Sequence, residues 1–519
     1  MRRIKDLNDM VSFIPPRSVA ELEAQFGVHY PQTIGSLING DRVEDGDETW
    51  SLQYPATEEV FASGVSLAKE KAADVAEQAA AAFKAGDWRL KPLSERQAIF
   101  YRVAEQILKH KDELAFIQAL ETGIPYKQFQ GFHVPRAAEN FRFFADVAST
   151  FAGETYQQME RYLSLTLHEP IGVGLVVAPW NAPLALASMK IAACLITGNS
   201  CIVKPSEYTP YSVLRLVECV IEAGVPSTAV HVVNGLGPKA GAALVESPSV
   251  DAINFVGGTE TGKRIMAAAS ETLKKIGLEL GGKSANIVLK SADFERALDG
   301  SLMSIFAGNG EQCLVGSRIM IERSIYEEFA SAFVERAANL KIGDPFADDV
   351  EIGPLAFKSH YDRVCSYVGI AQEEGSEILC GGGRPEGADR GFFIEPVVAR
   401  AQTNDARICQ EEIFGPYASL MPIDDLDQGI ELANQSDFGL VSYIWTDDVP
   451  SMMKASTGIR AGTVWVNTPV ARDLRAHFGG YKQSGIGRDG LPGSIELFTE
   501  QKTVMLPTNP LFMPKLGTS

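Results

Sequence analysis

The sequence has few cysteines, and their arrangement excludes two classes of protein. Seven cysteines are spread over 519 residues. The number is odd and the spacing is neither close nor regular, which excludes a disulfide framework and a CxxC metal site. We therefore predict no metal centre, and the reducing cytoplasm as the location of the protein.

Positive charge is also scarce. Lysine and arginine number 47 against 66 acidic residues, so the formal net charge is −19 at pH 7. Surfaces that bind nucleic acid carry an excess of positive charge, and we expect no nucleic-acid partner. Any attraction for an anionic small molecule must come from a local cluster of basic side chains.

Long apolar runs are absent. The most apolar region, residues 171–197, is interrupted by residues that would be costly in lipid, namely Pro179, Asn181, Pro183 and Lys190. The basic N-terminus reaches Pro15-Pro16 without the apolar core of a signal peptide. We expect neither a membrane span nor an export signal.

What the sequence does contain is an alternation of strand and helix patterns. Short apolar runs typical of buried parallel strands lie at residues 172–178, 200–203, 230–233 and 252–256. Helices are predicted from Pro210 to Gly224, with Thr209 as the cap, and near residues 239–246. The alternation predicts an α/β fold with a doubly wound nucleotide-binding sheet, and the length predicts two or three domains.

An amphipathic helix is predicted before this region. Ser94 to Gln97 has the sequence of a capping box, and apolar residues then recur at helical spacing from Ile99 to Leu108.

Two glycine-rich segments could bind phosphate. Gly485 to Gly490 matches the GxGxxG fingerprint, but it follows a loop and Pro492 intrudes, so we do not expect it to hold phosphate. Gly257 to Gly262 follows the predicted strand 252–256 and opens a helix whose free amides can face a pyrophosphate. An ordinary strand-to-helix turn is the alternative for this second segment.

Two further residues are candidates for chemistry. Cys313 lies in the turn-prone segment Gly308-Asn309-Gly310-Glu311-Gln312-Cys313, which would leave its thiol accessible as a nucleophile. Glu279 ends an apolar stretch just before Gly281-Gly282, where its carboxylate could be a general base. Taken alone, such a cysteine is more often a small core residue, and such a glutamate is more often structural.

Both segments belong to a series of motifs in a fixed order. The series is Pro179-Trp180-Asn181, Lys204-Pro205-Ser206-Glu207, Gly257 to Gly262, the Glu279 and Cys313 segments, Glu411 to Pro416, and Phe478 to Lys482. From about Leu37 to Val504 the sequence resembles the aldehyde dehydrogenase superfamily. It departs from the common pattern at Gly258, where serine is common, and at Glu311, where glutamine is common. Neither position carries the reaction.

The resemblance implies a domain organisation. A Rossmann-like NAD-binding domain would comprise residues 1–144 and 167–278, with residues 1–35 as an N-terminal extension of unassigned role. Residues 279–487 would form an α/β catalytic domain. A small β oligomerisation element would be built from residues 145–166 and 488–519, which implies a homodimer or a homotetramer.

The resemblance also assigns roles in catalysis and cofactor binding. Cys313 would be the nucleophile, Glu279 the base that hydrolyses a thioester, and the Asn181 side chain, with the Cys313 backbone N–H, the oxyanion donor. Family members that transfer the acyl group to coenzyme A tend to lack this base, so hydrolysis is favoured. The residues expected to bind the cofactor are Trp180, Lys204, Glu207, Gly257, Gly258, Thr259, Leu280, Glu412 and Phe414. A carboxylate at Glu207 accepts free ribose hydroxyls and repels a ribose phosphate, which favours NAD over NADP.

Substrate preference is indicated by two segments. Residues 134–141 and 470–475 resemble the branch that acts on muconic semialdehydes, the 2-hydroxymuconate and 5-carboxymethyl-2-hydroxymuconate semialdehyde dehydrogenases. In that branch, arginines matching Arg136 and Arg472 line the substrate tunnel, and the planar guanidinium pairs well with a carboxylate. Phe478 is expected beside them. Arg472 and Arg475 cannot be ranked from the sequence, both arginines could be structural, and His477 departs from the proline common there.

The sequence thus predicts NAD-dependent oxidation of a small-molecule aldehyde, of the carboxylate-bearing muconic type, to a carboxylic acid through a cysteine thiohemiacetal and a thioester. A broad aromatic or aliphatic aldehyde dehydrogenase is the first alternative. A catalytically silent dinucleotide-binding relative is the second, and the joint presence of Cys313, Glu279 and Asn181 disfavours it.

Overall fold

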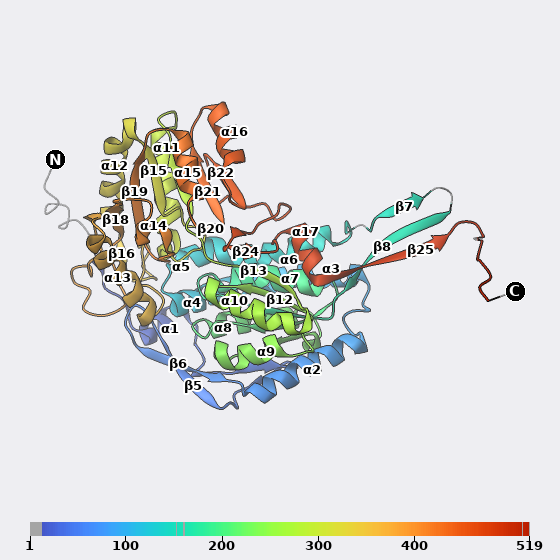
Figure 1. Cartoon of the computed structure of the whole chain (residues 1–519). Helices are drawn as coiled ribbons and strands as arrows, with labels where there is room; N and C mark the ends of the chain where they lie inside the picture. Colours follow the sequence, from blue (N-terminus) through green and yellow to red (C-terminus); the bar gives the residue numbers. More distant parts are fainter. Residues whose placement is uncertain (1–12, 152, 159–160, 511, 518–519) are drawn as a thin grey trace.

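The structure, a computed structural model, describes residues 13–151, 153–158, 161–510 and 512–517. Two α/β bodies pack against each other, and a narrow three-stranded arm projects from one of them (Figure 1). In the part of the chain that is described, no helix combines the length and the apolar character needed to cross a bilayer.

The first body is built on an eight-stranded sheet. Its strand order is β24-β13-β12-β9-β10-β11-β3-β4, and the five inner strands β13 to β11 are parallel. The strands are β3 (Ser36–Ile38), β4 (Asp41–Val43), β9 (Val173–Val177), β10 (Ser200–Lys204), β11 (Val230–Val232), β12 (Ala252–Val256), β13 (Lys275–Glu279) and β24 (Gly485–Ile486). The predicted doubly wound parallel sheet and its four predicted strands are confirmed.

Helices cover both faces of this sheet because its strands are apolar on both sides. Side chains of α2 (Lys69–Ala85), α9 (Ala242–Glu246) and α10 (Thr259–Ala269) pack on one face, against residues such as Leu175 and Ile253. Those of α3 (Leu93–Lys109), α6 (Val134–Ala148), α7 (Pro183–Ile196) and α8 (Pro210–Glu222) share the core on the other face with Val176 and Val203. Shorter elements complete this body: β2 (Thr33–Ile34), β5 (Glu48–Gln53), β6 (Val60–Ser66), α4 (Lys111–Thr122) and α5 (Tyr126–Gln128).

One predicted helix cap is wrong, and the other has the predicted position without a side-chain hydrogen bond. Helix α3 begins at Leu93 with Pro92 as the cap and no side-chain capping bond, because the Pro92 carbonyl already accepts the amides of Glu95 and Arg96. Ser94 therefore lies inside the first turn. Thr209 does precede α8, but its hydroxyl makes no capping bond. The buried Glu121 carboxylate of α4 replaces it and accepts the backbone amides of Tyr211 and Ser212.

The second body is a seven-stranded sheet of order β17-β18-β19-β15-β14-β21-β22, in which only β17 is antiparallel. Its strands are β14 (Ala285–Val288), β15 (Arg318–Glu322), β17 (Glu377–Cys380), β18 (Val397–Arg400), β19 (Tyr417–Ile423), β21 (Val441–Trp445) and β22 (Thr463–Val466). Helices α11 (Phe294–Phe306) and α12 (Tyr326–Ala338) pack on one face, and α13 (Lys358–Glu373), α14 (Arg407–Gln410), α15 (Leu426–Asn434) and α16 (Val449–Gly458) pack on the other.

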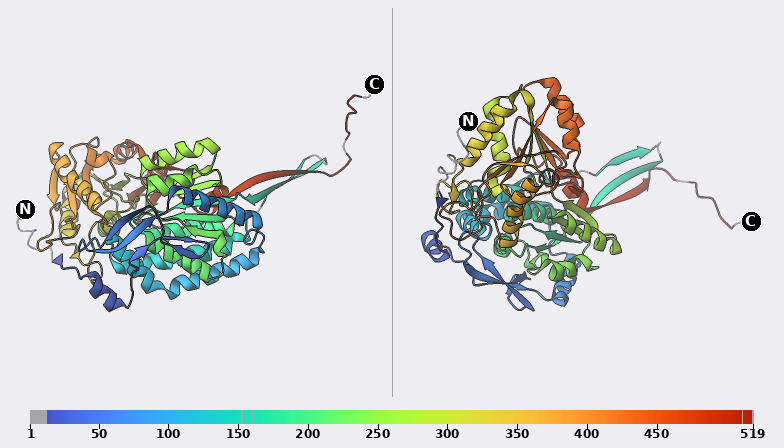
Figure 2. Two further views of the ribbon diagram at one scale, coloured as in Figure 1. Left: turned by 90° about the horizontal axis from the view of Figure 1, so that it is seen from below. Right: turned by 60° about the vertical axis from the view of Figure 1, so that its left-hand side comes forward.

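The arm is an antiparallel sheet that lies away from both bodies (Figures 1 and 2). It consists of β7 (Thr155–Gln158), β8 (Tyr162–Pro170) and β25 (Thr499–Pro507), in the order β25-β8-β7. Helix α17 (Leu491–Phe498) leads from the first body into β25. Chain segments from the middle and the end of the sequence are thereby joined.

The N-terminal segment links the two bodies. Strand β1 (Phe13–Ile14) pairs in parallel with β16 (Ile342–Gly343), and Arg17 forms a 2.6 Å ion pair with the buried carboxylate of Asp344. Helix α1 (Val19–Phe26) then brings the Phe26 ring against Phe116 of α4 and Phe346. The part of the extension that is described therefore has a structural place that the sequence did not indicate.

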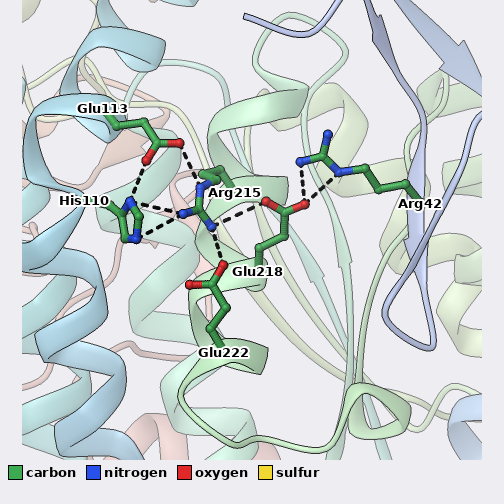
Figure 3. A network of polar contacts seen from close by, with 6 residues as sticks. All are labelled: Arg42, His110, Glu113, Arg215, Glu218 and Glu222. Atoms are coloured by element: carbon green, nitrogen blue, oxygen red, sulfur yellow. Dashed lines mark hydrogen bonds and ion pairs between the residues drawn. The ribbon is translucent and has the colours of Figure 1, made fainter. Parts of the chain in front are cut away.

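A buried arginine organises a polar network on the first body (Figure 3). The Arg215 side chain, only 9% exposed, contacts Glu113 at 2.9 Å, Glu222 at 2.9 Å and Glu218 at 3.5 Å. Glu218 also binds Arg42 of β4, at 2.6 Å. One guanidinium thus contacts three carboxylates and holds α4 and α8 together.

We expect Arg215→Met to destabilise the first body, because it leaves three clustered carboxylates without their shared cation. Breaking a buried ion pair in this way costs about 3 kcal/mol, so the midpoint of thermal unfolding should fall by several degrees. Differential scanning calorimetry measures it. Glu222→Gln, at the half-exposed rim of the network, is the matched control and should cost less than about 1 kcal/mol. An unchanged midpoint for Arg215→Met would show that the network carries no stability.

Candidate active site

The candidate site lies where the parallel strands of the first sheet end. Strand order reverses between β9 and β12, and ligands of open α/β sheets bind beside such a point, outside the carboxyl ends of the strands. Asn181 follows β9, Lys204 ends β10, Gly257 follows β12 and Glu279 ends β13. The direction of the strands alone therefore gathers four predicted site residues at one edge.

The predicted nucleophile lies on a tight loop that the second body presents to this edge. Gly308, Asn309 and Gly310 have φ values of 60°, 58° and 70°, a left-handed conformation that glycine and asparagine tolerate best. The Gly308 amide donates to Gln128 Oε1 at 2.9 Å, and Asn309 Nδ2 donates to the Pro354 carbonyl at 3.0 Å. The loop is thus fixed from both bodies.

Cys313 is half-buried at the end of this loop. Its side chain packs on an apolar cluster formed by Leu440, Val441, Tyr443, Trp465 and Phe478. Burial, followed by the charges of Glu412 and Glu279, raises the pKa of the Cys313 thiol to about 12. Without cofactor and substrate, the thiol is therefore protonated at neutral pH.

Asn181 is joined to the nucleophile loop by a hydrogen bond. Its Nδ2 donates to the Glu311 carbonyl at 2.7 Å, and the residue is buried. An amide nitrogen carries two hydrogens, so the second hydrogen remains for an oxygen near Cys313. The geometry is suited to stabilising an oxyanion on a carbon that the thiol attacks.

The predicted base is buried beside an ion pair that was not predicted from the sequence. Glu279 is 8% exposed and its Oε2 has no hydrogen-bond partner. Lys190 Nζ contacts both carboxylate oxygens of Asp489 at 2.9 Å, and both residues are buried. Burial and then Asp489 raise the pKa of Glu279 well above its usual range, while Lys190, Arg472 and Arg488 act in the opposite direction.

A signal for this ion pair was present in the sequence. Lys190 interrupts the most apolar stretch of the chain, and a lysine inside such a helix requires a buried partner. Its partner Asp489 lies in the segment that matches GxGxxG. In the structure this segment begins with β24, which pairs antiparallel with β13, so it is not the strand-to-helix turn of a phosphate-binding fingerprint.

The residues predicted to hold a dinucleotide fit such a ligand. No side chain caps the first turn of α10, and Thr259 Oγ1 is buried without a partner, which leaves donors for a pyrophosphate. Lys204 is buried at the end of β10, and its Nζ lies 3.9 Å from Glu207 Oε2. Trp50 Nε1 donates to the Glu207 carbonyl at 2.7 Å and fixes this loop.

The other predicted cofactor residues lie toward Cys313. Gly282 N donates to Glu412 Oε1 at 3.0 Å. The rings of Trp180 and Phe414 pack edge to face, with 5.3 Å between their centroids. Burial raises the pKa of Glu412 to about 7, and the Gly282 amide is the strongest opposing effect. Leu280 packs against Gly262 of α10 and Gly258 is exposed, so these two contribute no side-chain polar contact.

The structure distinguishes the two arginines that the sequence could not rank. Arg472 lies over the Phe478 ring, 4.3 Å from its centroid, and its Nη2 is 4.0 Å from Asp489. Arg475 is 75% exposed and paired with Asp473, so Arg472 is the one directed toward Glu279. Arg136, in the first turn of α6, has a buried Nη2 without a partner. Burial and then the charge of Arg472 lower the pKa of Arg136, while Glu139 and Asp473 raise it.

Comparisons with known proteins agree with this geometry. A model described as "Aldehyde dehydrogenase family" matches residues 43–504. The 5-carboxymethyl-2-hydroxymuconate semialdehyde dehydrogenase of Escherichia coli is 41% identical over 462 residues, which cover 88% of this chain and 97% of that protein. The 2-hydroxymuconic semialdehyde dehydrogenase of Pseudomonas sp. (strain CF600) is 39% identical over 480 residues, 91% of this chain and 99% of that protein. The NAD+ complex of aldehyde dehydrogenase from Bacillus cereus superposes with a TM-score of 0.90 at 36% identity, over 95% of this chain and 100% of that chain.

The raised thiol pKa predicts how Cys313 reacts without cofactor. Only the thiolate attacks iodoacetamide, so the alkylation rate of Cys313 should rise about tenfold per pH unit between pH 7 and pH 10, because the pKa lies near 12. Peptide mass spectrometry follows this cysteine separately from half-buried Cys365, and Cys313→Ser should show no adduct at that peptide. A rate that levels off below pH 9 would contradict the raised pKa.

Proposed function

This chain belongs to the aldehyde dehydrogenase family, and from that premise we propose that it oxidises an aldehyde to a carboxylic acid with NAD as the cofactor. One observation carries the proposal: the Asn181 amide, the Cys313 loop and the buried Glu279 carboxyl meet at the edge of a sheet that fits a dinucleotide. A catalytically silent relative would have no reason to keep all three groups together.

The first step is formation of a carbon–sulfur bond. Cys313 releases its thiol proton to solvent, and the Sγ thiolate attacks the aldehyde carbon, which becomes tetrahedral. The resulting oxyanion accepts hydrogen bonds from Asn181 Nδ2 and from the Cys313 backbone N–H. The side chains of Tyr443, Trp465 and Phe478 form an apolar wall beside this adduct.

The second half of the reaction needs a base. When bound, NAD supplies the hydride acceptor. Loss of hydride from the thiohemiacetal carbon leaves a thioester on Cys313, and Glu279 then takes a proton from a water molecule that attacks the thioester carbon. The carbon–sulfur bond breaks, the acid is released, and the leaving thiolate takes the proton held by Glu279, which restores the thiol and the carboxylate. A carboxyl group whose pKa is raised by burial must be deprotonated to act, so turnover should increase with pH as Glu279 ionises.

Glu207 supports NAD over NADP. Its carboxylate is half-buried, close to Lys204 at the end of β10, where the ribose of an adenine nucleotide would lie. A ribose hydroxyl can donate to this oxygen, but a phosphate on that hydroxyl would be repelled.

The substrate class is proposed from the two arginines. Arg136 Nη2 is a buried donor without an acceptor, and Arg472 is close enough for its charge to lower the pKa of Arg136. A carboxylate placed between them would satisfy both. We therefore favour a carboxylate-bearing semialdehyde of the muconic type, in accord with the names of the two enzymes that are about 40% identical.

The arm supports a homodimer or a homotetramer. Its strands expose apolar side chains that a monomer leaves in water, namely Tyr156, Leu167, Met505 and Leu506. We also propose the division into a cofactor domain, a catalytic domain and an oligomerisation element that the sequence predicts, with the exception that β24, inside the range of the catalytic domain, pairs with β13 of the first sheet. All seven cysteines are free, which supports a reducing compartment such as the cytoplasm.

The order of steps predicts a stalled intermediate in Glu279→Gln. With NAD and a simple aldehyde, the purified variant should release about one NADH per active site in a burst and then stop, because the thioester is not hydrolysed. Absorbance at the NADH band measures the burst, and intact-protein mass reveals the acyl adduct.

Cys313→Ala is the companion variant. It should show no burst and no adduct while still binding NAD+, because the cofactor is held by other residues. Steady turnover by Cys313→Ala would remove the nucleophile assignment, and unchanged turnover by Glu279→Gln would remove the base.

The proposed pairing of Arg136 and Arg472 with a substrate carboxylate, called the clamp below, predicts that loss of either arginine lowers the oxidation of one substrate class selectively. Removing one partner of a desolvated charge pair costs about 2–5 kcal/mol, so Arg472→Ala and Arg136→Ala should lower kcat/KM for a muconic-type semialdehyde by tens-fold or more. An uncharged aldehyde of similar length should be oxidised almost as well as before.

The matched control is Arg475→Ala, since Arg475 is exposed and paired with Asp473. It should change neither substrate's kcat/KM by more than about twofold. Equal losses for charged and neutral aldehydes in both tunnel variants would refute the clamp and favour a general aldehyde dehydrogenase.

A further inference from the structure

One turn of α13 contacts the loop that carries two of the predicted cofactor residues. His360 and Arg363, which are three residues apart, lie on the same side of this helix. His360 Nε2 is 2.7 Å from the Phe414 carbonyl oxygen, and Arg363 Nη1 is 2.8 Å from the Ile413 carbonyl oxygen. Arg363 Nη2 also donates to the carbonyl of Glu412. Three successive carbonyls are therefore held by two side chains.

This loop needs such support because its backbone is strained. Phe414 has φ of 65°, a left-handed conformation that costs a non-glycine residue on the order of 1 kcal/mol. The conformation lets the Glu412 carboxylate reach Gly282 N while the Phe414 ring faces Trp180. A relaxed backbone at Phe414 would separate these two groups.

The hydrogen bond from His360 has a defined direction. A carbonyl oxygen only accepts, so Nε2 must carry the hydrogen. The charged or titratable groups that face the ring are Glu311, whose Oε1 is 3.5 Å from Nε2, and Arg363. Burial lowers the pKa of His360 to about 4 and raises the pKa of Glu311. The imidazole is therefore uncharged at neutral pH, in the Nε2–H form.

The same ring also contacts the oxyanion side of the site. Its centroid is 5.3 Å from that of Trp180, which directly precedes Asn181. Glu311 accepts the Ala356 amide at 3.0 Å through its side chain, and its own carbonyl accepts Asn181 Nδ2. His360 thus lies between the cofactor loop and the loop that carries Cys313, and is 7% exposed.

We propose that His360 and Arg363 are positioning residues for the cofactor, which hold the backbone of residues 412–414 in the shape that binds the nicotinamide ribose and ring. The proposal rests on the proposed function. Neither residue needs to touch the cofactor: each acts through a main-chain carbonyl. Loss of either donor lets Phe414 leave its strained conformation, so the side chains of Glu412 and Phe414 are no longer held in fixed positions.

The test separates the hydrogen bond from the packing of the ring. His360→Phe keeps an aromatic ring in the pocket and removes the N–H donor, whereas His360→Gln removes the ring and retains a donor. NAD+ is titrated into each protein by calorimetry without aldehyde. His360→Phe should weaken binding about tenfold, and His360→Gln should stay within about threefold of the unaltered protein.

Arg363→Met is an independent variant at an exposed position, where folding is not at risk. It removes the donors to two carbonyls and should also weaken NAD+ binding by several-fold. The matched control is Lys358→Met on the same helix. Lys358 is exposed, and among the described residues its ammonium pairs with Asp362 alone, so NAD+ binding should not change.

A second measurement excludes general damage to the site. Hydrolysis of an aryl ester by the Cys313 thiol requires no hydride acceptor, so Arg363→Met should keep this activity while KM for NAD rises. Equal NAD+ affinity in the unaltered protein, His360→Phe and Arg363→Met would overturn the inference. Equal weakening by His360→Phe and His360→Gln would also overturn it, since the donor would then be irrelevant.

Failure of the proposed function gives a different result. If the unaltered protein neither binds NAD+ nor forms NADH with any aldehyde, the function itself is wrong. If it does both and the variants behave like it, only the positioning role is lost.

Discussion

The site depends on one constraint, the shared direction of the five inner strands of the first sheet. Because they are parallel, their carboxyl ends meet at one edge, and every group that follows a strand must lie there. The second body has to present its nucleophile to this edge, and the chain crosses between the bodies directly after Glu279. The crossing is Gly281-Gly282, where space is short: a side chain at Gly282 would lie 2.5 Å from the Cys313 carbonyl oxygen, and one at Gly281 would overlap the Glu412 carboxylate. Glycine is thus required by the meeting of the two sheets.

Gathering these groups has an electrostatic cost. Burial raises the pKa of Cys313, Glu279 and Glu412 alike, and the two carboxyls raise that of the thiol further. Three negative charges cannot be held together in this volume. Lys190 offsets part of the charge but is already paired with Asp489. The chemistry is therefore suited to proceeding in sequence, with the thiol losing its proton in one half-reaction and Glu279 acting as the base in the other.

The fold could be predicted because its signals are local. Apolar runs such as residues 252–256 are buried on both faces, and strand β12 has these same bounds. The predicted capping box of α3 was wrong because the Pro92 carbonyl accepts the first amides. Thr209 is the N-cap residue of α8 as predicted, but the distant Glu121 carboxylate, which tertiary packing places there, accepts the amides of Tyr211 and Ser212. The site shows the same division. Motifs predicted that Asn181, Glu279 and Cys313 lie near one another. His360 belongs to no motif, and its proposed role could be inferred only from the position of α13 in the fold.

If Arg136 and Arg472 bind a substrate carboxylate as proposed, they illustrate how selectivity can arise from the cost of an unpaired donor. Arg136 Nη2 is buried without an acceptor, and the positive charge of Arg472 lowers the Arg136 pKa. The cofactor-free protein therefore pays a desolvation cost of about 1–3 kcal/mol for such a donor. A neutral aldehyde leaves that cost in place, while a carboxylate removes it and adds a charge-assisted hydrogen bond. The preference for a carboxylate-bearing aldehyde then has two sources. The donor stays unpaired in the complex with a neutral aldehyde, and a hydrogen bond is gained in the complex with the charged one. A site of this kind can reject neutral aldehydes without any steric barrier, and Asp489, 4.0 Å from Arg472, limits the effect by already neutralising part of one guanidinium.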